Sequence, residues 1–424
     1  CTGCAVGKYV DVEGSSAVSD CIDCPVGKYM DEIGSDEATD CIHCIAGKWV
    51  GATGSAASSD CIECDPGKYV DTSGSDSAGD CIDCAAGRWA SASGSDHADD
   101  CVECAVGKYT HVLGSTAAAD CIDCVAGKYV DVTGSDQESD CVVCAPGTYA
   151  PLFGSTAASD CLACPAGTYV SVVGSSAVSD CIDCGVGKYL DSEGNSDIAA
   201  CISCIAGKYV DVSGSGDETD CITCARGKYS TVVASEREGD CIPCVAGKYI
   251  DVAGSDEAVD CIACAAGRYV DAPGSDHAGD CIGCPSGRYV ASSGSDELTD
   301  CIECVAGQYV SVAGSTGCIE CAAGRWVAAG GSTHSSSCIM CVAGKYSSGR
   351  GGESAAACID CAAGKYVDVA GSDAESDCID CMAGKYVETM GSAAVSACID
   401  CPEDTYVDVR GSTAVGDCIL CAAD

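Results

Sequence analysis

Cysteine recurs along this chain with a strict period. All 44 cysteines lie in 22 Cys-x-x-Cys pairs, which open at Cys1, Cys21, Cys41 and every 20 residues to Cys301, then at Cys318, Cys338, Cys358, Cys378, Cys398 and Cys418. The common unit reads Cys-Ile-x-Cys-x-Ala-Gly-Lys-Tyr-Val-Asp-Val-x-Gly-Ser-x-x-x-x-Asp, and its positions are numbered 1 to 20 here. A period this regular predicts a tandem array of small units, and a structural role is the first hypothesis.

A 20-residue unit with one aromatic side chain cannot offset its ordering entropy by burial alone. Cysteine, about a tenth of all residues, is the expected support. We therefore expect small disulfide-rich repeats forming an elongated, rod-like solenoid or ladder, with short strands and turns and little helix. Residues 1–317 hold sixteen repeats, the last three residues short, and residues 318–424 hold five more and a truncated sixth. Cys1 starts a repeat directly, so we expect one continuous array taken from a longer chain, with any signal sequence removed or upstream.

The Cys-x2-Cys-x16-Cys-x2-Cys spacing also fits a four-cysteine zinc site. Zinc would require repeats to alternate in pairs, and odd and even repeats look alike, which favours disulfides. A bridge within one Cys-x-x-Cys would leave the repeats unlinked. The alternative joins position 4 to position 1 of the next repeat. That alternative predicts Cys4–Cys21, Cys24–Cys41, Cys44–Cys61, Cys304–Cys318, Cys321–Cys338, Cys401–Cys418 and their equivalents, and it leaves Cys1 and Cys421 without partners.

Position 9 is aromatic in all 21 repeats that reach it, including Tyr9, Tyr29, Trp49, Tyr69, Trp89, Trp326 and Tyr406. We expect this ring to pack on the neighbouring disulfide, with carbohydrate stacking as the alternative. Position 8 is basic in 17 of those repeats. It is expected either to be solvated or to pair with an acid at position 11, 16 or 20 of an adjacent repeat or chain.

Glycine stands at positions 7 and 14 in 20 of 21 repeats and predicts two turns or a close backbone approach. Between the turns, Lys-Tyr-Val-Asp-Val predicts a short strand. Position 20, usually Asp, is expected to accept local backbone hydrogen bonds after a loop or single helical turn.

The run Cys4-Ala-Val-Gly7-Lys-Tyr9, followed by Cys21, resembles the first cysteine module of tumour-necrosis-factor receptor ectodomains. It is still more similar to the ephrin-receptor-like cysteine repeat of large cell-surface proteins. The resemblance covers nearly every repeat and implies an extracellular, disulfide-linked, elongated scaffold. It carries no ligand-binding residues over to this chain, because only scaffold positions match.

Charge and redox chemistry narrow the functions further. Many paired cysteines require an oxidising environment, so we expect an extracellular or cell-surface protein. The net charge of −44 argues against nucleic acid, and no apolar run is long enough to span a membrane. No cofactor is expected, and the acidic charge permits Ca²⁺ only as a loosely bound counter-ion. Asn195 is followed by Ser-Asp, so no N-glycosylation sequon exists, whereas O-linked glycans on Ser and Thr are plausible partners.

Three functions remain open on the sequence. The first is a structural subunit or stalk of an extracellular filament that associates with itself, of the flagellar-hair, sheath or wall-fibre type. The second is a spacer in the ectodomain of a receptor or adhesin. The third is a Ca²⁺-dependent binding module. An enzyme is not expected, because no constellation of His, Asp and Ser stands out from the repeat.

Overall fold

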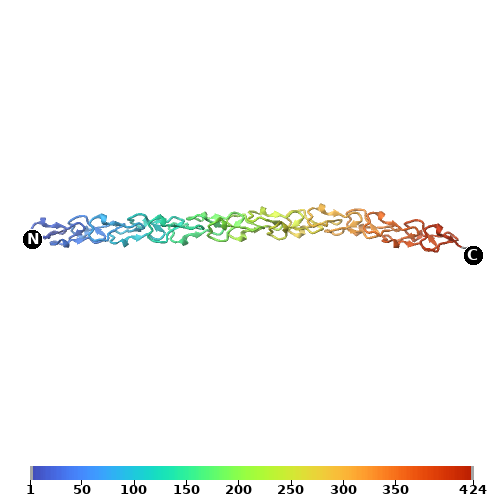
Figure 1. Cartoon of the computed structure of the whole chain (residues 1–424), viewed down its shortest axis with the longest axis horizontal. Coiled ribbons are helices and arrows are strands. Elements are labelled where there is room, and N and C mark those ends of the chain that lie inside the picture. Colours follow the sequence, from blue (N-terminus) through green and yellow to red (C-terminus); the bar gives the residue numbers. More distant parts are fainter. Residues whose placement is uncertain (1–2, 422–424) are drawn as a thin grey trace. The chain divides into compact units, whose positions relative to one another are not determined.

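The computed structural model describes residues 3–421. The chain divides into two compact units: residues 1–203 with 212–220, and residues 204–211 with 221–424. Each unit is a series of two-stranded antiparallel sheets, one for each joint between successive repeats (Figure 1). Short strands and turns, with only three-residue helices, match the fold expected of small disulfide-rich repeats.

Every strand within residues 3–421 is two residues long. Odd-numbered strands occupy positions 8 and 9, and even-numbered strands occupy positions 2 and 3 of the next repeat, from β1 (Lys8–Tyr9) and β2 (Ile22–Asp23) to β41 (Thr405–Tyr406) and β42 (Ile419–Leu420). The register places Lys8 opposite Asp23 and Tyr9 opposite Ile22. The same register recurs at each joint between described repeats, which links successive repeats by backbone hydrogen bonds.

The strand expected over positions 8 to 12 is therefore too long, and the strand at positions 2 and 3 was missed. After position 9 the backbone leaves the strand pair. Position 10 turns inward and is buried, whereas Val132 and Val172 at position 12 are exposed on a turn. Residues at position 10 instead donate their N–H groups to the carbonyl at position 15 of the next repeat, as Val50 does to Ser75 at 3.1 Å.

A single 3₁₀ turn closes each full-length repeat at positions 18 to 20, from η1 (Val18–Asp20) to η20 (Val415–Asp417). The expected role of position 20 is confirmed. In repeat 8, for example, the N–H groups of Thr156 and Ala157 donate to Asp160 Oδ2 at 2.7 and 3.1 Å. Repeat 16, which is three residues short, has no such turn between Tyr309 and Ile319.

The two glycine turns are also confirmed. Glycines at positions 7 and 14 adopt positive φ throughout the described repeats, as Gly127 (84°) and Gly134 (72°) do. The two departures keep the same backbone: Ala234 has φ 60° and Asp404 has φ 65°. The left-handed conformation is thus set by the fold, and glycine is the residue that adopts it at least cost.

Candidate functional site: the joint between repeats

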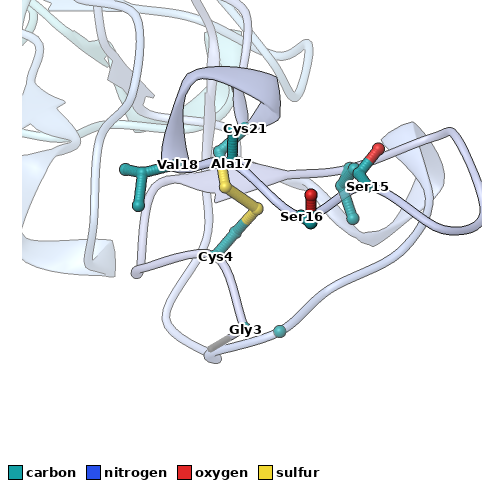
Figure 2. Close-up of a pocket in the computed structure, with 9 residues that line it drawn as sticks. Gly3, Cys4, Ser15, Ser16, Ala17, Val18 and Cys21 are labelled. Atoms are coloured by element: carbon teal, nitrogen blue, oxygen red, sulfur yellow. A yellow bond between two sulfur atoms is a disulfide. The ribbon is translucent and has the colours of Figure 1, made fainter. Parts of the chain in front are cut away.

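Each joint is built around one disulfide. Bridges join position 4 to position 1 of the next repeat, with the two Cα atoms 5.8 Å apart in Cys4–Cys21, Cys24–Cys41, Cys44–Cys61, Cys304–Cys318 and Cys321–Cys338 and 5.9 Å apart in Cys401–Cys418. Figure 2 shows the first of these bridges. Cys421 is exposed and unpaired, and Cys1 lies outside the described residues. The disulfides therefore cross each boundary between repeats.

One aliphatic and one aromatic side chain complete each core. Cys64, Val70 and Cys81 form a buried cluster, and Trp49 of the preceding repeat packs against it. The same arrangement places Tyr9 on Cys24, Met30 and Cys41, and Tyr29 and Tyr69 on the two corresponding clusters. Trp89 and Trp326 are half-buried in strands opposite Val102 and Ile339, and Tyr406 is exposed. Each of these cores therefore draws on three successive repeats, so packing links neighbouring repeats.

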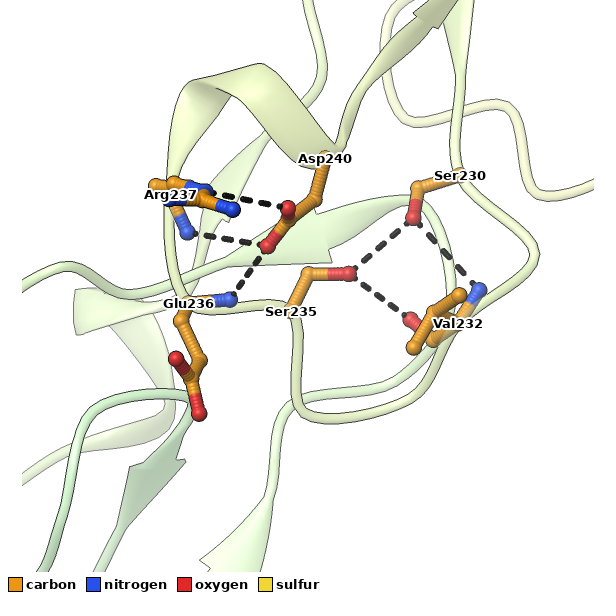
Figure 3. A network of polar contacts seen from close by, with 6 residues as sticks. All are labelled: Ser230, Val232, Ser235, Glu236, Arg237 and Asp240. Carbon is orange, nitrogen blue, oxygen red and sulfur yellow. Dashed lines mark hydrogen bonds and ion pairs between the residues drawn. The ribbon is translucent and has the colours of Figure 1, made fainter.

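Polar residues replace the aliphatic side chain in three cores. Thr110, Ser230 and Ser347 at position 10 are buried. Figure 3 shows repeat 12, where the Ser230 and Ser235 hydroxyls lie 3.0 Å apart and Ser235 donates to the Val232 carbonyl at 3.0 Å. Sequence reasoning did not single out these hydroxyls, although a polar residue at position 10 is visible in the sequence.

The basic residue at position 8 forms a cross-strand ion pair. Lys8 Nζ lies 3.0 Å from Asp23 Oδ1, and Arg88 pairs with Glu103 at 2.7 Å. Within the chain the partner is position 3 of the next repeat where that residue is acidic, so the prediction of position 11, 16 or 20 of an adjacent repeat is wrong. Strand register decides this, because position 8 stands directly opposite position 3. Pairing with an adjacent chain stays a prediction.

Position 3 acids also bind the next turn. Ser93 and Thr133 at position 13 donate to Glu63 and Glu103. The Ser93 hydroxyl, and after it Lys48, lowers the pKa of Glu63. In the same way the Thr133 hydroxyl, and after it Arg88, lowers the pKa of Glu103. Where position 3 is apolar, the position 8 lysine forms its ion pair with another residue. Lys128, which stands opposite Val143, pairs with Glu138 of its own repeat at 3.1 Å.

Groups that could perform chemistry are dispersed. All five histidines are exposed, and the rings of His97 and His277 accept hydrogen bonds from their own loops. The pKa of Tyr189 is raised, mainly because the ring is partly buried. The nearby carboxylates of Glu218, Asp191 and Asp217 raise it further. Within residues 3–421 no three or more His, Cys, Asp or Glu side chains are arranged to hold a metal ion. The same part of the chain contains no helix long and apolar enough to cross a membrane.

The fold and the joint define a class, the tandem disulfide-rich repeat protein. Residues 133–181, 253–301, 292–338 and 373–418 match the family described as tyrosine-protein kinase ephrin type A/B receptor-like. These four segments thus carry ephrin-receptor-like cysteine repeats. Many disulfides are typical of extracellular or cell-surface proteins. No curated protein matches the chain.

Proposed function

We propose that this chain is a structural, non-catalytic part of an extracellular filament, as its subunit or its stalk. The observation that carries the proposal is the uniformity of the joint. The same disulfide pairing and the same strand register recur at each described boundary, while sequence variation falls mainly on exposed turns. Repetition of one joint is suited to producing length and evenly spaced surface groups.

Electron microscopy of the purified, oxidised chain tests this role. We expect concentration-dependent fibres, with sedimentation giving the same size distribution. A chain that stays monomeric at every concentration and salt condition would rule out a self-associating filament.

The second candidate is a spacer in the ectodomain of a receptor or adhesin, and the family match supports it. A globular head or a membrane-spanning segment in the same polypeptide would favour it over the filament. Calorimetric titration with Ca²⁺ addresses the third candidate, since a binding module would take up a fixed number of ions per chain.

A further inference from the structure

Repeats 8 and 9, residues 141–180, form an uncharged block in an otherwise acidic chain. Charged residues make up 20% of the whole sequence, but Asp160 and Asp180 are the only ones among these 40. Each uses its Oδ2 to accept two backbone N–H groups of its own loop, from Thr156 and Ala157 and from Ser176 and Ala177. Both carboxylates thus serve the local turn, and the turns and strands around them carry no charge.

Neutral residues fill the positions at which other repeats carry charge. Position 8 holds Thr148 and Thr168, whose hydroxyls donate to the Ala145 and Pro165 carbonyls at 2.7 Å. Position 3 holds Val143 and Ala163, and position 11 holds Pro151 and Ser171. The cross-strand ion pair between repeats 8 and 9 is therefore replaced by Thr148 opposite Ala163.

Large apolar side chains are exposed across the same block. This uncharged surface consists of Val142, Val143, Leu152, Phe153, Leu162, Val172, Val173 and Val178. Leu152 and Phe153 are each 69% exposed, and Phe153 is the only phenylalanine of the chain. Leu152, Phe153 and Leu162 line one shallow cavity of about 260 Å³. Val143 adjoins the second turn, since a Cβ placed on Gly174 would lie 3.6 Å from its Cγ1.

The turn residues of this surface, Leu152, Phe153, Val172 and Val173, lie outside the buried cores. Ala150 and Val170 at position 10 are the buried aliphatic residues of the two repeats. Single exposed apolar residues are ordinary on protein surfaces, but exposed apolar side chains concentrated in a segment with few charges favour a contact surface. One ion pair borders it: Asp123, whose carboxylate lies beside the turn at Gly154, is bound to Lys108 at 2.7 Å. An apolar centre with a polar rim is the usual anatomy of an interface.

We infer that residues 141–180 form a lateral contact between two copies of this chain, an inference that rests on the self-association proposed above. The distribution of charge favours a second copy of this chain as the partner at this surface. Two copies that meet elsewhere bring together surfaces of a chain with net charge −44, whereas residues 141–180 carry only the charges of Asp160 and Asp180 and let two copies approach with less repulsion.

Area and symmetry agree with a second copy. The eight side chains, each about half exposed, together expose on the order of 700 Å² of apolar surface, an upper bound to set against the ~800 Å² that each partner of a stable pair buries. A two-fold contact joins the same patch on both copies, so an apolar patch is its own complement.

Sedimentation of the full chain over a range of NaCl concentrations tests the inference. A Cys421→Ser background removes the exposed thiol and therefore any dimer linked through it. We expect a dimer that tightens as salt rises, because screening weakens the repulsion between acidic chains but leaves apolar contacts intact. We also expect Phe153→Glu combined with Val143→Asp to weaken the dimer at least tenfold.

Both substitutions introduce residue types that the array already carries at those positions, as in Glu13, Glu193 and Asp123, so the fold should be retained. Unchanged disulfide content and protease resistance verify this. The matched control is Val233→Glu, at the equivalent turn position of repeat 12, where Val233 is also exposed. It should leave the dimer unchanged.

The outcomes separate the two proposals. Fibres or dimers that persist in the Phe153→Glu, Val143→Asp variant overturn the lateral contact and leave the filament role standing. A dimer that depends on the block, without fibres in the microscope, supports the contact and removes the filament role. A wild-type chain that stays monomeric at all salt concentrations overturns both.

Discussion

The two glycines of each repeat differ in how much room surrounds them. A Cβ on Gly127, at position 7, would overlap the carbonyl oxygen of Gly174, two repeats further along. A Cβ on Gly134, at position 14, would meet the flexible side chain of Glu103 at 3.3 Å. Both residues have positive φ, but at Gly127 the close carbonyl also requires the absence of a side chain. Ala234 fits this distinction, because it occupies position 14, whereas Asp404 stands at position 7, so the requirement does not hold in every repeat.

Gly127→Ala should therefore destabilise its joint more than Gly134→Ala. The left-handed backbone alone costs about 1–2 kcal/mol for a residue with a Cβ, and only Gly127→Ala adds a collision with backbone. Hydrogen exchange at Gly174 N–H, which bonds the Cys144 carbonyl at 2.9 Å, should report the difference. We expect exchange to accelerate at least tenfold more in Gly127→Ala; equal acceleration in both variants would refute the close approach.

The position 20 aspartate makes the local loop sensitive to acid. The backbone N–H groups of Thr156 and Ala157 lower the pKa of Asp160 below its ordinary value of 3.8. Because the folded-state pKa is depressed, this stabilisation is fully present above the ordinary value and is lost as pH falls through the lower, folded value. The Thr156 and Ala157 amides should begin to exchange faster only below about pH 4.

Repeat 20 supplies a natural control for this acid sensitivity. Its position 20 is Ala397, and residues 393–397 contain no acid. The amide of Ala394 should show no such acid transition after correction for intrinsic exchange. A parallel transition at Ala394 would mean that acid acts on the repeat as a whole and not through the aspartate.

At the scale of the elements, the sequence predicts the disulfides and the glycine turns better than it predicts the pairing of strands. Cysteine and glycine spacing locate the joint and its turns, because each depends on one residue type at one position. Strands of two residues leave no alternating pattern, so the pairing of Ile22 with Tyr9 had no periodic signal. The ion-pair partner was missed for the same reason, since register alone brings Lys8 to Asp23.

The 3₁₀ turn of each repeat can be tested where the chain lacks one. In repeat 16 the Val290 N–H donates to the Ser315 carbonyl at 3.3 Å, and the loop closes Cys304 to Cys318 over 14 residues instead of 17. Replacing Thr316-Gly317 by the Thr156–Asp160 sequence should supply the missing turn and its capping carboxylate. We expect the Val290 amide to exchange several-fold more slowly, and replacement by five glycines should not have this effect, because glycine restores length without the aspartate.

Each described joint draws on nearby repeats, and this sets how damage should spread within a unit. Cys124, Val130, Cys141 and Tyr109 form one core, and backbone hydrogen bonds tie each repeat to its neighbours. Replacing Cys124 and Cys141 by Ala opens a 17-residue loop, at a cost of about 3 kcal/mol in the chain-entropy model. Because stability in such arrays is a sum of repeat and nearest-neighbour terms, the loss of stability should stay local.

We expect fast exchange at the Val130 amide, whose N–H bonds the Ser155 carbonyl at 3.2 Å. Exchange should be unchanged at the Val50 amide four repeats away, whose N–H bonds the Ser75 carbonyl at 3.1 Å. Simultaneous loss of protection at both residues would show that the unit unfolds as one cooperative body, and a joint could then not be the independent element from which a filament of any length is built.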